Sequence, residues 1–178
     1  MTTNPNVKPL ALISASIVGA TAALVFNTFP LFISQIAGHF DFDNQQAGFI
    51  GTAFLGAFAI VTLLANLWVP KVPWKGAILI SFVVISLSLL GLKFVQNANV
   101  AFVFIATLGL ASGVNFTIPT VILSRYRDPD RAFGIKLTVE MSLAAIVMIG
   151  MTKIIVDQFG FNGFIVGMSV TYLLLALA

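Results

Sequence analysis

The sequence predicts an all-α membrane protein with six transmembrane helices. The prediction rests on the high hydrophobic content, the low charge content and the pattern of apolar runs. Hydrophobic residues make up 59% of the 178 residues and charged residues only 8%, with a mean hydropathy of +1.05. Soluble domains carry roughly a quarter charged residues, so this chain could not cover a water-exposed surface. The apolar residues also fall into six runs near the length of about 20 residues that a membrane span needs. We therefore expect residues 1–178 to form a single six-helix transmembrane bundle.

Polar or proline-containing breaks separate the six expected spans. The first span follows a short polar tail and ends at GHFDFDNQQ, and the second ends where the prolines of PKVPWK stop a helix. QNAN follows the third span and SRYRDPDR follows the fourth. The last span ends at TYLLLALA without an interfacial anchor, which favours a fragment of a twelve-helix chain over a natural short terminus. The expected bounds are about 10–36, 46–69, 76–95, 100–123, 132–156 and 161–178.

The positive charges predict the orientation of the bundle. With an even number of spans, the N-terminus, the second and fourth loops and the C-terminus lie on the same side. Loops rich in Lys and Arg stay in the cytoplasm, so both termini are expected there, in a multi-pass inner-membrane protein. The cationic side carries Lys8, Lys71, Lys75, Arg125, Arg127, Arg131 and Lys136, whereas the other side carries only Lys93 and Lys153.

An internal repeat links the first and fourth spans. Thr28 and Thr117 each stand two residues before a proline, with an asparagine, Asn27 or Asn115, just upstream. The two threonines are 89 residues apart, and the same offset carries the second span onto the fifth. Two copies of a three-helix unit would lie in opposite orientations, since three is odd. Inverted repeats with interrupted helices at matching positions indicate a transporter binding site, although Thr-x-Pro also recurs by chance.

Glycines spaced four residues apart predict close helix packing. Gly109 and Gly113 form one such pair in the fourth span, and Gly163 and Gly167 form another in the sixth. Small residues let helix backbones approach in lipid. They predict a compact bundle and identify no function.

Glu140 is the one acid deep within a predicted span. It lies nine residues past Arg131, or about 13 Å along a helix, well inside the hydrocarbon core. An isolated charge there costs several kcal/mol, so the carboxylate is expected to be paired, protonated or facing a wet cavity. Lys136, four residues earlier on the same helix face, is the local partner. The alternative is a cavity-facing proton carrier or ligand for a cationic substrate group, and the two interpretations are compatible.

Other polar residues within the spans have weaker interpretations. Asn27 and Asn115 are expected to face the bundle interior, where each amide either binds substrate or bridges helices. Thr28 and Thr117 are expected to bond the carbonyls that the nearby prolines leave free. The absence of Cys excludes disulfides and thiolate sites, and the lone His39 cannot form a metal site by itself. We expect no enzyme activity, no metal, no cofactor and no nucleic-acid partner.

The six spans, the cytoplasmic termini and the two basic loops together resemble the N-terminal half of a major facilitator superfamily transporter. The family signature between spans two and three, G-x-x-x-D-R-x-G-R-R/K, retains basic character here only at Lys71 and Lys75. Asn66 and Pro73 stand where the motif has its two glycines, and Pro70 stands where it has its aspartate. The resemblance implies two inverted three-helix repeats and a gating loop, with Arg131 at the start of the fifth helix. The span-four arginine of proton-coupled members and the Gly-Pro motif of drug antiporters are absent, which disfavours drug antiport.

The sequence therefore predicts a secondary active transporter of a small organic solute, working by alternating access. The expected binding or coupling residues are Glu140, Asn27, Asn115 and Lys136, with proton coupling through Glu140 as a hypothesis. The expected partners are the lipid bilayer, the solute and either a missing C-terminal six-helix half or a second copy of the chain. The alternative is a non-transporting membrane assembly or sensor subunit that acts through helix contacts.

Overall fold

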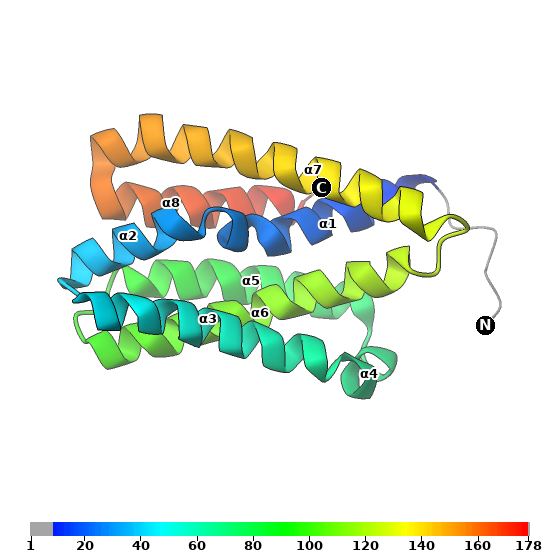
Figure 1. Ribbon diagram of the computed structural model, residues 1–178, viewed down its shortest axis with the longest axis horizontal. Coiled ribbons are helices and arrows are strands. Elements are labelled where there is room, and N and C mark those ends of the chain that lie inside the picture. Colours follow the sequence, from blue (N-terminus) through cyan, green and yellow to red (C-terminus); the bar gives the residue numbers. More distant parts are fainter. Residues whose placement is uncertain (1–8, 178) are drawn as a thin grey trace.

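The computed structural model describes residues 9–177, and Figure 1 shows them as a bundle of long helices. Every regular element within that range is helical, as the sequence predicted. Lys8 and Ala178, which belong to the predicted orientation and the predicted last span, lie outside the described residues. The helices are α1 (Pro9–Asn27), α2 (Phe29–Phe40), α3 (Asn44–Leu63), α4 (Ala65–Trp68), the 3-10 turn η1 (Val69–Lys71), α5 (Trp74–Leu92), α6 (Ala98–Leu123), α7 (Pro129–Gly150), the π-helical segment η2 (Met151–Val156) and α8 (Asp157–Leu175).

The first predicted span is broken at the Thr-x-Pro motif, whereas the fourth is not. α1 and α2 meet at Thr28 with a bend of 50°, as expected where Pro30 removes a backbone donor. Pro119 lies inside the unbroken helix α6, so the prediction of matching interruptions is wrong for the fourth span. The surroundings explain the difference, because Pro30 is exposed and Pro119 is buried. α6 packs against α1, α3 and α5, and neighbouring helices let a proline stay within a straight helix.

Capping and bending residues set the bounds of the second span. Asp43 and Gln46 form a capping box, in which the Gln46 backbone N–H donates to Asp43 Oδ1 at 2.7 Å and the Asp43 N–H donates to Gln46 Oε1 at 3.1 Å. α3 ends at Leu63, earlier than the predicted bound near residue 69. The chain leaves helical geometry at Leu64 and continues through the short elements α4 and η1.

The chain reverses direction near the start of α8. Gly160 has φ 55° and ψ −146°, a left-handed conformation that glycine adopts without strain. After this turn α8 runs back beside η2 (Figure 1). Among residues 9–177, four helices are long and apolar enough to cross a membrane, or five if the bent α1–α2 pair crosses as one span. The longest of these, Pro129–Leu175, contains the reversal at Gly160.

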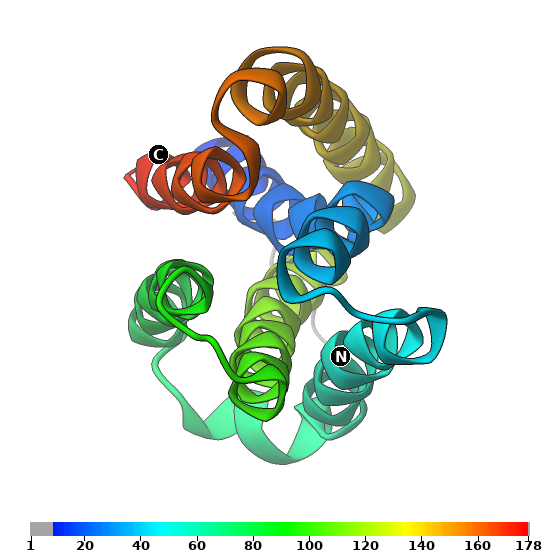
Figure 2. The same cartoon turned by 90° about the vertical axis from the view of Figure 1, so that its left-hand side faces the viewer.

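α6 lies at the centre of the bundle (Figure 2), with α1 and α3 packed against it. The predicted glycine pair lies in the α3–α6 contact, since a Cβ at Gly109 would meet the Phe54 backbone and one at Gly113 would meet Val61. The packing role predicted for these glycines is confirmed. α7 packs along α1, and α8 packs along α5.

Candidate functional site: a buried ion pair beside an aromatic cavity

Lys136 and Glu140 form an ion pair within α7. The distance from Lys136 Nζ to Glu140 Oε2 is 2.6 Å, and the side chains are only 4% and 9% exposed. The spacing of four residues places both groups on one face of the helix. The local pair that the sequence offered as one interpretation of Glu140 is therefore formed.

Asn27, the last residue of α1, contacts the same carboxylate from the neighbouring helix. Its Nδ2 donates to Glu140 Oε1 at 3.4 Å, which is long for a hydrogen bond. Glu140 thus holds Lys136 at one oxygen and Asn27, more weakly, at the other. The bend after α1 leaves Asn27 half-buried beside α7.

The Lys136 side chain passes over α1 and ends against an aromatic ring. A Cβ on Gly19 would lie 2.8 Å from Lys136 Cε, so the lysine stem occupies the space that a larger residue would need. Lys136 Nζ lies 4.8 Å from the ring centroid of Phe116 on α6. This is within the distance of about 6 Å at which a cation is attracted to a ring face. The ammonium therefore has two favourable contacts, one with a carboxylate and one with a ring.

Glu140 also lines a cavity of about 200 Å³ between four helices. The Phe26 and Phe58 ring centroids are 6.3 Å apart, and those of Phe58 and Phe116 are 5.4 Å apart. The Glu140 carboxylate is thus paired with Lys136 and also lines the cavity, and its role as a proton carrier or cation ligand stays a prediction. The lining residues are Ala22, Ala23, Phe26, Phe58, Phe116 and Glu140.

Asn115 lies apart from this cluster. It is fully buried, its Oδ1 accepts a hydrogen bond from the Ser81 hydroxyl of α5, and its Nδ2 has no partner among the described residues. The structure therefore brings Asn27, Lys136 and Glu140 together and leaves Asn115 in a different helix contact. The two asparagines differ in position, since Asn27 stands three residues before its proline and Asn115 stands four residues before its own. Each residue turns a helix by about 100°, so the two side chains lie on different helix faces.

The aromatic residues of the cavity were not predicted from the sequence. Phe116, not Asn115, stands 89 residues after Asn27, and Phe116 faces the ion pair as Asn27 does. The repeat offset applied residue by residue would have identified Phe116. No sequence signal distinguished Phe26 and Phe58 from the other phenylalanines, of which the chain has 17 in all.

The two threonines of the repeat make equivalent hydrogen bonds. Thr28 Oγ1 donates to the Leu24 carbonyl at 2.8 Å, and Thr117 Oγ1 donates to the Gly113 carbonyl at 2.7 Å. Each acceptor lies six residues before its proline, whereas a proline frees the carbonyl four residues before it. The prediction that these threonines bond the carbonyls freed by the prolines is therefore wrong, because each hydroxyl reaches back only one helical turn from its own position.

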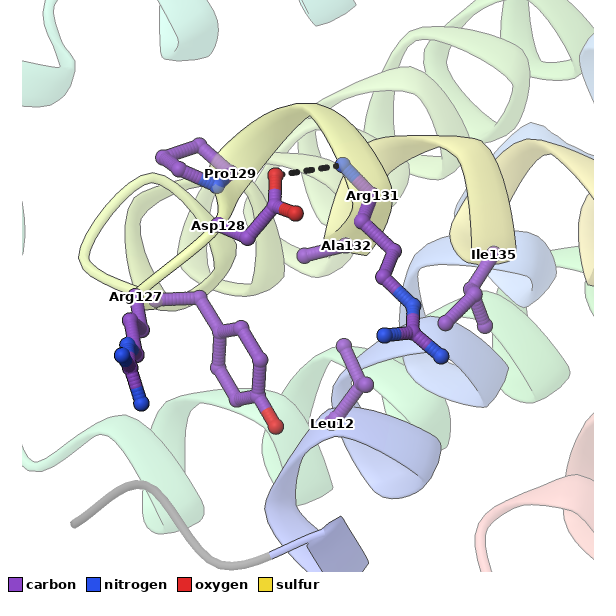
Figure 3. Close-up of a pocket in the computed structure, with 8 residues that line it drawn as sticks. Leu12, Arg127, Asp128, Pro129, Arg131, Ala132 and Ile135 are labelled. Atoms are coloured by element: carbon purple, nitrogen blue, oxygen red, sulfur yellow. Dashed lines mark hydrogen bonds between the residues drawn. The ribbon is translucent and has the colours of Figure 1, made fainter. Parts of the chain in front are cut away.

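The residues expected in the gating loop lie at the end of the bundle where α6 joins α7 (Figure 1). Lys71 and Lys75 are exposed at η1 and at the start of α5, and Arg131 is exposed in the first turn of α7. The Arg131 backbone N–H donates to Asp128 Oδ1 at 3.1 Å, which caps α7. Figure 3 shows the Arg131 side chain directed toward Leu12, beside a cavity of about 720 Å³.

The two basic loops meet through a cation–π contact. Arg125 Cζ lies 5.4 Å from the Trp74 ring centroid, which joins the end of α6 to the start of α5. Lys71, Lys75 and Arg131 make no ion pair within residues 9–177. Their gating role stays a prediction.

The chain matches no protein-family model, no curated protein and no solved structure. The class of protein therefore follows from the structure alone. Its helices are long and apolar enough for a membrane protein, and a buried ion pair lies beside an aromatic cavity among α1, α3, α6 and α7.

Proposed function

We propose that this chain is the six-span half of a secondary active transporter of the major facilitator type, which moves a small organic solute by alternating access. The observation that carries the proposal is the buried Lys136–Glu140 pair beside the aromatic cavity. Ionisable residues within membrane helices are rare and commonly line substrate or ion pathways. The ion pair, the rings and the cavity together have the composition of a small solute site.

The number of spans supports the proposal when the reversal at Gly160 is included. The four or five apolar helices contain Pro129–Leu175 as one element of 47 residues. At 1.5 Å per residue this element would be about 70 Å long, more than twice the thickness of the hydrocarbon core. Because it folds back at Gly160, it supplies two arms, and counting each arm as a span supports six spans among the described residues.

The helix contacts support two inverted repeats. The 89-residue offset relates the first span to the fourth and the second to the fifth. The contact between α3 and α6 should then have a counterpart between α7 and α1, and both contacts are extensive. A repeat of this kind places a substrate site near the middle of the membrane, where the two copies meet.

The proposed orientation places the α6–α7 connection in the cytoplasm of a cell with an inner membrane. The chain has no cysteine, so single cysteines can be introduced and labelled without removing native ones. Arg127→Cys, in the α6–α7 connection, should react with an impermeant maleimide only after the membrane is opened. Asn97→Cys, in the α5–α6 connection, should react in intact cells. The reverse pattern would contradict the proposed orientation.

Transport requires a second six-helix half, either in the same chain or as a second copy, against which this half rocks. Proton coupling through Glu140 is part of the proposal, because a carboxyl group beside a cavity can exchange a proton as well as a cation. The test is solute uptake into proteoliposomes by the complete carrier, measured across pH. Glu140→Gln should abolish the pH dependence, and Asp157→Asn, an exposed acid outside the cavity, should preserve it. Unchanged pH dependence and rate in Glu140→Gln would remove the coupling role.

A further inference from the structure

The cavity beside Glu140 has the surroundings of a cation site. Its charged lining residue is an acid, and the rings of Phe26, Phe58 and Phe116 form much of the rest. Lys136 pairs with that acid but is not among the lining residues. A solute in the cavity therefore meets carboxylate and aromatic surface, and the lysine ammonium lies behind them.

Carboxylates and ring faces both favour positive charge. The face of an aromatic ring is electrically negative, so it attracts a cation and repels an anion. The chain already uses this attraction, since Lys136 Nζ lies 4.8 Å from the Phe116 ring centroid. The same ring also borders the cavity. An anionic solute would meet only unfavourable partners there.

Glu140 can accept a second cation without releasing the first. Oε2 holds Lys136 at 2.6 Å, whereas Oε1 has only the 3.4 Å contact with Asn27. A carboxylate has about four acceptor positions over its two oxygens. Oε1 thus has the capacity to pair with an ammonium group in the cavity.

The volume limits the size of the solute. About 200 Å³ is below the range of roughly 300–1,000 Å³ that is common for drug-sized ligands. A small alkylammonium head group suits this space better than a polycyclic cation.

We propose that the cavity binds the ammonium group of a small organic cation, enclosed by Phe26, Phe58 and Phe116, with Glu140 as its counter-charge. The inference rests on the proposed transport function, since it names the class of solute for that site. Lys136 stays paired with Oε2 of Glu140. It therefore compensates the charge of this carboxylate when no solute is bound.

The test compares choline with 3,3-dimethylbutan-1-ol, its uncharged carbon isostere, by equilibrium binding to the purified full chain in detergent. The two probes match in shape, so a difference in affinity reports the charge. Choline should bind at least tenfold more tightly. Phe58→Leu should weaken choline binding by about threefold to thirtyfold, the range of a desolvated cation–π contact. Phe49→Leu is the matched control, because Phe49 is on α3 but outside the cavity, and it should leave choline binding unchanged.

A second variant removes the counter-charge while keeping the protein folded. Lys136→Met combined with Glu140→Gln leaves no buried charge, and its helix content is checked by circular dichroism. In this variant the preference for choline over the isostere should fall, and the preference that remains is due to the three rings. Equal binding of the two probes to the parent chain, or an undiminished preference for choline in the double variant, overturns the cation site.

Uptake assays separate this inference from the proposed function. Choline binding without uptake of any cation by the complete carrier would overturn transport and leave the cation site standing. Uptake of an uncharged or anionic solute that choline does not inhibit would overturn the cation site and leave transport standing.

Discussion

The interaction between Lys136 and Glu140 gives the sharpest prediction for stability. A solvent-exposed i,i+4 ion pair contributes about 0.3–0.5 kcal/mol. Here the two side chains are only 4% and 9% exposed, so the values for buried charges apply. Removing one partner of a buried pair destabilises a protein by about 3–5 kcal/mol, because the other charge is left uncompensated. A single charge at the centre of a membrane helix costs about 2.5–3.5 kcal/mol on insertion scales.

The two ranges overlap near 3 kcal/mol, and this is the expected loss for Lys136→Met alone or Glu140→Gln alone. The double variant should lie within about 1 kcal/mol of the parent, since replacing both partners by groups of similar volume is often neutral. The effects are therefore strongly non-additive. A loss of about 3 kcal/mol is a large part of a typical stability of 5–15 kcal/mol, yet the single variants stay folded.

The measurement is the free energy of unfolding in mixed micelles, followed by far-ultraviolet circular dichroism during denaturant titration. Lys153 and Asp157 provide a matched control, because they have the same spacing and are both exposed. Lys153→Met and Asp157→Asn should each change stability by less than about 0.5 kcal/mol. Single losses below about 1 kcal/mol at Lys136 and Glu140, or a double loss equal to their sum, would refute the reasoning.

Three further substitutions test the packing around the site by the same unfolding measurement. Gly19→Ala should destabilise by about 1–3 kcal/mol, since its Cβ would lie 2.8 Å from the lysine stem, whereas Gly134→Ala on α7 meets nothing within 4 Å and should not destabilise. Gly109→Ala should cause a similar loss because its Cβ meets the α3 backbone, and Gly56→Ala, which has open space, is its control. Asn27→Ala should cost no more than about 0.6 kcal/mol, because its 3.4 Å contact is long; a loss above about 2 kcal/mol would show that the amide holds α1 to α7.

The element boundaries could be predicted where a sequence signal sets the backbone locally. The capping box at Asp43 and the proline after Asp128 lie close to the predicted starts of α3 and α7. The turn at Gly160 also falls between the predicted fifth and sixth spans. The bend at Thr28 was foreseeable in the same way, since Pro30 stands two residues after it. These signals act within one or two helical turns and need no knowledge of the neighbouring helices.

The continuity of α6 could not be predicted, because it depends on neighbours. Pro119 has the same local motif as Pro30 but lies buried in the helix that packs against α1, α3 and α5. Packing on several sides opposes a bend that a proline at an exposed position can produce. The same Thr-x-Pro signal therefore led to different structures, and tertiary contacts explain the difference.

One part of the candidate site follows from local sequence spacing, and another part depends on how the helices pack. The Lys136–Glu140 pair follows from spacing on one helix, which a sequence reports directly. Phe58 reaches the cavity only because α3 crosses α6 closely at Gly109 and Gly113. Gly109 and Gly113, which the sequence linked to packing and to no function, thus help to position Phe58 in the proposed cation site. A substitution at Gly113 should therefore affect choline binding as well as stability, although this residue touches no solute.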